Sequence, residues 1–263
     1  MDYTFKEKYS FEDLVEILRI LRAPGGCPWD REQTHESIRR NFIEETYEAV
    51  EAIDTGDKEL LCEELGDVML QVVFHAQISQ DAGGFDINEV CDGICKKLII
   101  RHPHVFADVS ADTSEKVLEN WDKIKMQTKS QTTYADTLRS VSPALPSLIR
   151  AEKVQHKAAK CGFDWDDVSG ALEKVSEETE ELREAIDLKD SQRINDELGD
   201  LLFSVVNVSR FVDVDAEKAL GDSCQKFIER FAKVENLATS RGLDMKTASL
   251  AELDSIWDEI KHS

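Results

Sequence analysis

Proline and glycine are scarce in this chain, at 5 and 12 of its 263 residues. Both residues mark turns and interrupt helices, so the chain is predicted to have few connections and to be rich in helix. No segment alternates apolar and polar residues with the period of two that a half-buried strand requires. We therefore expect an all-α protein without a sheet.

Positive charge is also in short supply. The chain has 32 Lys and Arg against 54 Asp and Glu, which gives a formal net charge of −22. This acidic balance argues against nucleic acid and against anionic membrane surfaces as partners. It still permits a phosphorylated substrate, provided that metal ions neutralise the charge on both sides.

Long apolar runs and paired cysteines are absent. No run approaches the length that spans a membrane, and residues 1–10 contain no apolar segment of the kind found in secretory signals. The six cysteines, at positions 27, 62, 91, 95, 161 and 224, include no Cys-x-x-Cys pair. This pattern favours reduced thiols in a cytoplasmic protein over disulfides or a zinc site.

Apolar residues spaced three and four apart predict helices along most of the chain. Ser10 and Asp86 are predicted N-caps, the latter with Glu89 three positions on as a capping box. Cys27-Pro28-Trp29-Asp30 is expected to be an ordered loop. The predicted helices begin after Ser10 and cover about 34–53, 58–80, 87–101, 114–127, 147–160, 170–187, 190–212, 215–240 and 250–261.

The helical pattern stops once and then restarts. Residues 129–146 are rich in Ser and Thr and contain two of the five prolines, so they are predicted to be a linker. The linker would separate an N-terminal unit, 1–128, from a C-terminal unit, 147–263.

The second unit repeats the first. Glu44 and Glu177 lie 133 positions apart (177 − 44), and Glu64 and Glu197 keep the same offset (197 − 64). Ala52-Ile53 recurs as Ala185-Ile186, again 133 positions later (185 − 52). A fixed offset inside helices is typical of a duplicated helical domain.

Each unit carries carboxylates on two successive predicted helices. Acids three apart lie on one face of a helix. With a turn near Thr55-Gly56, antiparallel helices would set Glu48 opposite Glu64, and Glu45 opposite Asp67. The second unit repeats this register around a turn near Leu188-Lys189, with Glu178, Glu181, Glu197 and Asp200.

Two interpretations of these acids stay open on the residues alone. The first is a solvated acidic face, which is what most charge runs are. The second is a metal site, favoured by the repeated register and by Gly66 and Gly199. A mid-helix glycine costs roughly 1 kcal/mol relative to alanine, so each indicates a close helix approach or room for a ligand.

Carboxylates without histidine suit hard cations, Mg²⁺ or else Mn²⁺. Di-iron bundles place Glu-x-x-His on facing helices, and no histidine stands at these positions. A carboxylate-bridged metal or redox bundle and an acidic helical interaction protein remain as alternatives. Glu177, beside Glu178, is a spare acid that can orient or deprotonate an attacking water.

An anionic substrate also needs cations. Lys226 and Arg230 lie four apart on one predicted helix, while Lys174 and Arg193 lie near the acids of the second unit. The positions 133 residues before Lys174 and Arg193 hold Asn41 and Leu60, so the first unit lacks two of these cations. Trp257 is expected either to stack on a base or to pack in a core.

Glu-Glu-x-x-Glu followed by Glu-x-x-Asp resembles the MazG family of nucleoside triphosphate pyrophosphohydrolases. Further motifs carry the resemblance over nearly the whole chain: Cys27-Pro28-Trp29-Asp30, Glu63-Glu64-Leu65-Gly66-Asp67, His102-Pro103-His104-Val105-Phe106-Ala107-Asp108 and Gly162-Phe163-Asp164-Trp165. The resemblance implies two tandem all-α units built on antiparallel hairpins, a bundle core completed in a homodimer, and a catalytic second unit beside a structural first one. It implies Mg²⁺-dependent hydrolysis of nucleoside triphosphates to monophosphate and pyrophosphate, in nucleotide-pool control or house-cleaning.

The resemblance also assigns roles to positions. It implies catalytic roles for Glu177 and Glu178. The implied metal ligands are Glu178, Glu181, Glu197 and Asp200, and the implied nucleotide contacts are Lys174, Arg193, Lys226, Arg230 and Trp257. Two positions depart from the family pattern: Arg193 replaces a lysine, and Glu229 stands where a basic residue is expected.

Overall fold

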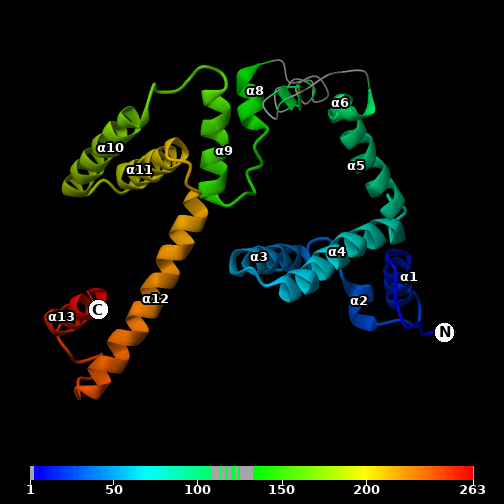
Figure 1. The fold of residues 1–263 in the computed structure, drawn as a ribbon, viewed down its shortest axis with the longest axis horizontal. Coiled ribbons are helices and arrows are strands. Elements are labelled where there is room, and N and C mark those ends of the chain that lie inside the picture. The colour runs from blue at the N-terminus through cyan, green and yellow to red at the C-terminus, as the bar shows by residue number, and fades with distance from the viewer. Residues whose placement is uncertain are drawn as a thin grey trace. The chain divides into compact units, whose positions relative to one another are not determined.

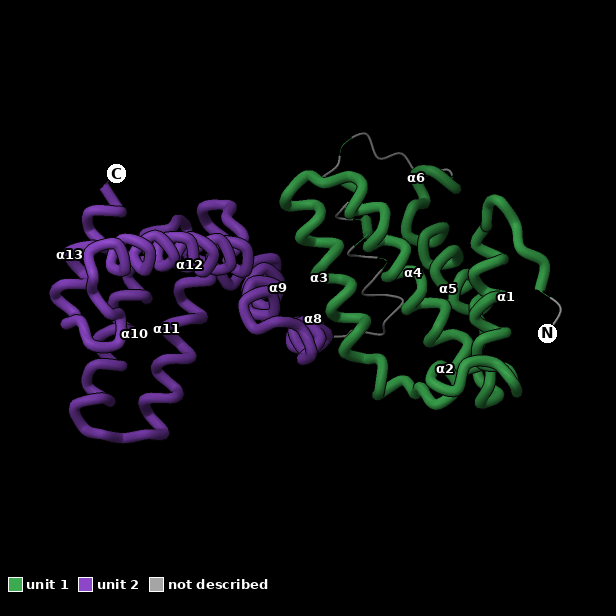
Figure 2. The backbone as a smooth tube through the Cα atoms, turned by 90° about the horizontal axis from the view of Figure 1, so that it is seen from below, with its two compact units in different colours: residues 1–125 green, residues 126–263 purple. Residues whose placement is uncertain are grey.

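The protein is seen here in a computed structural model, which describes residues 3–107, 113, 116, 117, 120, 121, 124 and 133–262. Within these residues helices are the only regular elements, as the composition predicts (Figure 1). They divide into two compact units, 1–125 and 126–263 (Figure 2). The helices are α1 (Phe11–Arg22), α2 (Pro28–Glu32), α3 (Arg39–Thr55), α4 (Lys58–Asp81), α5 (Ile87–Arg101), α6 (Pro103–Phe106), α8 (Tyr134–Arg139), α9 (Ser147–Ala159), α10 (Val168–Leu188), α11 (Ser191–Phe211), α12 (Ala216–Ser240) and α13 (Leu250–Lys261).

Each unit is built on one antiparallel hairpin. In the first unit α3 packs along α4, and in the second α10 packs along α11. Small residues let the paired helices approach: Ala52 is 1% exposed, and its repeat Ala185 is 0% exposed. In each unit a helix that precedes the hairpin in the chain packs against the second helix of that hairpin: α1 contacts α4, and α9 contacts α11.

The two hairpin turns have the same form with different residues. Each first helix ends in a left-handed residue, Gly56 with φ of 71° and Lys189 with φ of 54°. The next residue, Asp57 or Asp190, caps the second helix, and its side chain accepts hydrogen bonds from two backbone N–H groups. Such caps satisfy donors that have no partner inside the helix. The common register predicted for the two units rests on this shared turn.

Separate apolar cores hold the remaining helices in place. In the first unit Leu18 of α1, Ile38 before α3 and Val73 of α4 are each at most 3% exposed and belong to one cluster. In the second unit Val234 and Ala238 of α12 pack with Ile256 of α13. Figure 1 shows α12 running away from the α10–α11 hairpin, with α13 against its far half.

The predicted caps are confirmed, whereas some helix boundaries are wrong. Ser10 and Asp86 both form capping boxes. The helix expected from residue 34 begins at Arg39, because Thr34 and Ser37 instead bond each other's backbone N–H groups. The helix predicted at 114–127 lies mostly outside the described residues.

Three short helices in the described part of the chain were not predicted. Two of them, α2 and α6, begin at prolines, which supply a backbone angle suited to the first helical turn. The third, α8, lies in the segment expected to be a linker and starts at a capping box of Thr133 and Asp136. Each is too short for the period of 3.6 residues to be visible in the sequence.

All six cysteines are free thiols. No helix in the described part of the chain combines the length and the apolar character needed to cross a membrane.

Candidate active site

Each hairpin brings carboxylates from both of its helices together. In the second unit Glu178 of α10 meets Glu197 and Asp200 of α11, with one oxygen of each within 4.8 Å of the others. In the first unit Glu45, Glu48 and Glu64 lie equally within 4.8 Å, so that Glu48, the equivalent of Glu181, takes part where Asp200 does in the second unit. The predicted gathering of acids across antiparallel helices is therefore present in both units.

The fourth predicted acid of each cluster lies beside these groups. Burial raises the pKa of Glu181, and the charges of Glu197 and Glu178 raise it further. Glu181 is thus within electrostatic range of the three gathered acids without belonging to the tightest group. In the first unit Asp67 is likewise close to the gathered acids, because burial raises the pKa of Glu45 and the charge of Asp67 raises it further.

Glu178 is the most deeply placed acid of the second cluster, at 4% exposed. Its Oε2 atom is buried and accepts no hydrogen bond within the described part of the chain. A buried carboxylate oxygen without a partner is costly. A divalent cation held by Glu178, Glu197 and Asp200 would satisfy it, so the residues present fit a metal ion.

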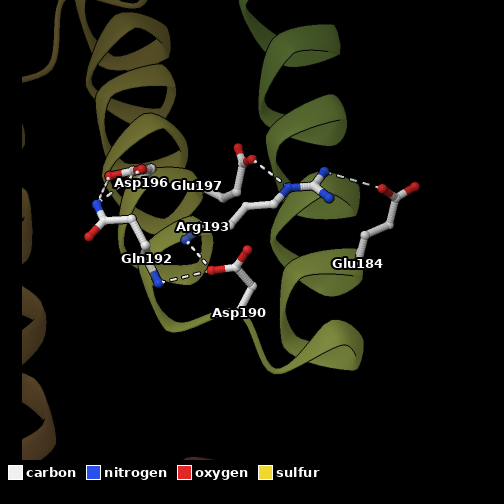
Figure 3. Close-up of polar contacts among 6 residues, drawn as sticks. All are labelled: Glu184, Asp190, Gln192, Arg193, Asp196 and Glu197. Atoms are coloured by element: carbon white, nitrogen blue, oxygen red, sulfur yellow. Dashed lines mark hydrogen bonds and ion pairs between the residues drawn. The ribbon is translucent and has the colours of Figure 1, made fainter.

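Two cations already contact these acids. The Lys174 Nζ forms an ion pair with Glu178 one turn further along α10, and it lies 3.0 Å from the Glu177 carboxylate. The Arg193 Nε donates to Glu197 at 3.1 Å, and its Nη2 donates to Glu184 at 3.3 Å (Figure 3). Hydrogen bonds to these carboxylates raise the pKa of both Lys174 and Arg193.

Glu184 is a residue that the sequence analysis missed. Figure 3 shows it reaching across from α10 to Arg193 on α11, while Asp190 caps the start of α11. The spacing about the turn could have predicted this contact, because Glu184 lies a few residues before the turn and Arg193 a few residues after it. Residues placed symmetrically about a tight antiparallel turn lie opposite each other.

The structure does not bring Lys226, Arg230 and Trp257 to the carboxylates of their own chain. Lys226 is exposed and Arg230 is half-buried on α12, and neither forms an ion pair with a described residue. The Trp257 ring lies 5.2 Å from that of Phe227 and packs against the core of α12 and α13. One expectation for Trp257, packing, is confirmed, and its stacking on a base stays a prediction.

The mid-helix glycines keep space free. A Cβ added at Gly66 or at Gly199 would meet no atom within 4 Å in the described part of the chain. A close helix approach within one chain is therefore wrong as their explanation. Room beside the carboxylates remains the alternative.

The Gly162-Phe163-Asp164-Trp165 motif has a structural role at the entrance to α10. Arg210 of α11 donates to both oxygens of Asp164, at 2.9 and 2.5 Å. The Trp165 ring covers Gly170, where an added Cβ would lie 2.2 Å from the ring. The motif thus fastens the connection between α9 and α10 onto the far end of α11.

Replacing Asp164 by asparagine is expected to lower the free energy of unfolding of the second unit by about 2 kcal/mol at pH 7, the size of a charge-assisted hydrogen-bonded pair. The Arg210 hydrogen bonds hold the pKa of Asp164 below its usual value. A carboxyl with a lowered pKa stabilises the fold above its unfolded pKa of about 3.9, and this contribution disappears as the pH falls through the folded pKa.

Urea unfolding, followed by tryptophan fluorescence at pH 7 and at pH 3, checks this expectation. The difference between the wild type and Asp164→Asn should shrink at pH 3. Asp166→Asn, two positions along, removes an exposed carboxylate and is the matched control. Equal losses for both variants at pH 7 would contradict the role given to the Arg210 pair.

The first unit lacks the cations of the second. Asn41 and Leu60 stand where Lys174 and Arg193 stand in the repeat (174 − 41 and 193 − 60 both equal 133). Burial and the neighbouring acids raise the pKa of both Glu45 and Glu64. The two clusters therefore share their acids and differ in their balancing charge.

A sequence model described as the MazG nucleotide pyrophosphohydrolase domain matches residues 33–106 and 167–234, once in each unit. The Thermotoga maritima protein named nucleoside triphosphate pyrophosphohydrolase/pyrophosphatase MazG is 47% identical over 251 residues, 95% of each chain. The Escherichia coli K12 nucleoside triphosphate pyrophosphohydrolase is 42% identical over 253 residues, 94% of this chain and 95% of that one. Bacillus subtilis YabN, an uncharacterised protein, is 45% identical over 256 residues, 97% of this chain and 52% of that one.

Proposed function

This chain belongs to the MazG family of nucleotide pyrophosphohydrolases, and from that premise we propose which of its residues carry out the reaction. The protein is an enzyme that hydrolyses nucleoside triphosphates, as its closely similar relatives are named. In the reaction water attacks a phosphorus atom and the anhydride bond between the α and β phosphates breaks, which gives nucleoside monophosphate and pyrophosphate. A redox bundle and an interaction protein without chemistry are set aside on the family match.

The second unit is proposed as the catalytic one. The observation that carries this assignment is the pair of cations beside its acids, Lys174 at Glu178 and Arg193 at Glu197. A triphosphate carries several negative charges, so its site needs such cations as well as metal. The first unit, with Asn41 and Leu60, is proposed to be structural.

The metal ligands are proposed to be Glu178, Glu181, Glu197 and Asp200, and the metal to be Mg²⁺, with Mn²⁺ as a substitute. Only oxygen ligands are present in this set, which suits hard cations. When bound, such an ion polarises a phosphate and lowers the pKa of an attacking water. Glu178, with its unpartnered Oε2, is the ligand most in need of it.

The other groups divide the remaining tasks. Lys174 and Arg193 bind phosphate oxygens, and Arg193 presents two parallel donors where a lysine would present a point charge. Glu177 is exposed next to the ligand Glu178 and orients or deprotonates the water. These groups hold the phosphates and a water in one place before reaction, which is the main source of catalysis in phosphoryl transfer.

A homodimer is proposed to complete the site. Large apolar side chains are exposed along the hairpin and along α12, among them Leu198, Leu202, Phe203, Phe227 and Ile228, each 43–59% exposed. Monomers rarely expose so much apolar surface. Lys226 and Arg230 lie on this same α12, so the α12 of a second copy is proposed to bring them to the phosphates. The set of free thiols fits the cytoplasmic location expected from the sequence.

The reaction is tested by product identification. The pure protein is incubated with Mg²⁺ and each of the eight common nucleoside triphosphates, and products are separated by ion-exchange chromatography. Monophosphate and pyrophosphate in equal amounts are expected, and omission of Mg²⁺ should abolish them. Diphosphate with inorganic phosphate would contradict the proposed bond.

A further inference from the structure

The cations of the second cluster occupy the positions where a metal ion is needed. Lys174 pairs with Glu178 and Arg193 with Glu197, and both acids are proposed metal ligands. The Glu178 side chain is 5% exposed and that of Glu197 is 15% exposed, whereas each cation is 35% exposed, so the acid of each pair lies in a poorly solvated place and its cation at the edge of that place. Opposite charges attract more strongly there than in bulk water.

Each cation also has a second, exposed acid within reach. Lys174 lies 3.0 Å from Glu177, whose side chain is 57% exposed. Arg193 lies 3.3 Å from Glu184, whose side chain is 60% exposed. The cations therefore have a partner on the rim of the cluster as well as one inside it. Leaving the inner acid does not leave either of them without a counter-charge.

The first cluster shows the same acids without this arrangement. Asn41 and Leu60 replace the two cations, while Glu45, Glu48 and Glu64 still lie with one oxygen of each within 4.8 Å of the others. The chain thus holds an internal comparison in which the four acids are kept at equivalent positions and the cations at 174 and 193 are not. The raised pKa values of Glu45 and Glu64 agree with an unbalanced cluster.

We propose that Lys174 and Arg193 are built-in counter-ions that hold the metal ligands ready and move to the substrate phosphates when the metal displaces them. This inference rests on the proposed function of the second unit. A divalent ion carries more charge than either side chain and competes for the same oxygens. Metal and triphosphate then assist each other: the metal frees the cations, and the phosphates keep them from returning.

The proposal predicts that Lys174 weakens metal binding in the absence of nucleotide. Lys174→Asn and Arg193→Leu give the second cluster the residues of the first. Each of these two variants is expected to bind Mg²⁺, in the absence of nucleotide, about tenfold more tightly than the wild type does, which is within the usual range for coupled binding sites. The measurement is a calorimetric titration without nucleotide, in a chain whose first cluster is silenced by Glu45→Gln and Glu64→Gln.

Lys233→Asn in the same chain is the matched control, since it removes one exposed positive charge from α12. It accounts for the general attraction of a less positive protein for Mg²⁺. Binding by Lys174→Asn no tighter than by Lys233→Asn would overturn the proposal. A second readout is the melting temperature, which should fall without metal in Lys174→Asn and rise more than in the wild type when Mg²⁺ is added.

The reciprocal change keeps the test informative if Lys174→Asn does not fold. Installing Asn41→Lys and Leu60→Arg, with Glu178→Gln silencing the second cluster, should weaken Mg²⁺ binding to the first. Unchanged binding there would count against the proposal.

Failure of the proposed function gives a different result. If Lys174→Asn binds Mg²⁺ more tightly than the wild type, and the wild type releases no pyrophosphate, the proposed reaction is refuted and the counter-ion role is kept. If the wild type releases pyrophosphate and Lys174→Asn binds Mg²⁺ no more tightly than the control, only the counter-ion role is refuted.

Discussion

Glu178→Ala is expected to lower Mg²⁺-dependent pyrophosphate release by at least about a hundredfold, because removing groups that merely support a metal ligand already costs 10- to 100-fold. Glu178 is the buried member of the second cluster, and its Oε2 has no other partner in the described part of the chain. Its loss removes a proposed ligand and also leaves Lys174 without its inner acid. The assay is pyrophosphate release from the preferred nucleoside triphosphate at saturating Mg²⁺.

Glu45→Ala is the matched control for this prediction, since Glu45 holds the position of Glu178 in the first unit (178 − 45 = 133). It should retain most of the activity. Equal losses in the two variants would refute the assignment of catalysis to the second unit. Circular dichroism of both variants separates a lost site from a lost fold, because the helical signal should stay at the wild-type level.

Mixing two inactive variants is expected to restore activity. Glu178→Ala lacks a proposed ligand, and the double variant Lys226→Ala with Arg230→Ala lacks the proposed phosphate contacts on α12. If α12 serves the partner's carboxylates, a mixed dimer has one intact site and one doubly damaged site. Random pairing at equal amounts then yields about a quarter of the wild-type activity, as expected for a symmetric dimer with two shared sites.

The control mixture combines Glu178→Ala with Asp200→Ala, whose changes fall in the same half of the site. No recovery is expected, since every site then lacks a carboxylate. Co-expression with two different tags isolates the mixed dimers directly. Absence of recovery in the first mixture would mean that Lys226 and Arg230 act within their own chain or not at all.

Periodicity and capping chemistry were sufficient to predict the long helices. Ser10 and Asp86 mark their helices by local hydrogen bonds that need no tertiary structure. The late start of α3 depends instead on a competition between local bonds at Thr34 and Ser37 and a further turn of helix. Propensity alone does not decide such a competition.

The carboxylate cluster was predictable because a helix and a short turn fix which residues meet. The same register that predicted Glu178 near Asp200 also contained the Glu184 contact with Arg193. By contrast, the place of Lys226 and Arg230 depends on the direction of α12 after α11, which no local pattern specifies. Periodicity within one chain likewise carries no information about a second copy of it.

The turn between α10 and α11 determines which faces of the two helices point toward each other at the site. The left-handed Lys189 and the capping Asp190 are the only residues between the two helices. One extra residue in a helix rotates every residue beyond it by about 100° about the helix axis. The first acid of each cluster is separated from the last by 22 positions in both units (67 − 45 and 200 − 178). The turn sequence has diverged from Gly56-Asp57 to Lys189-Asp190 while this length stayed the same. Selection on this protein should therefore act on spacing as strictly as on the acids themselves, so that substitutions in the turn are tolerated and insertions are not.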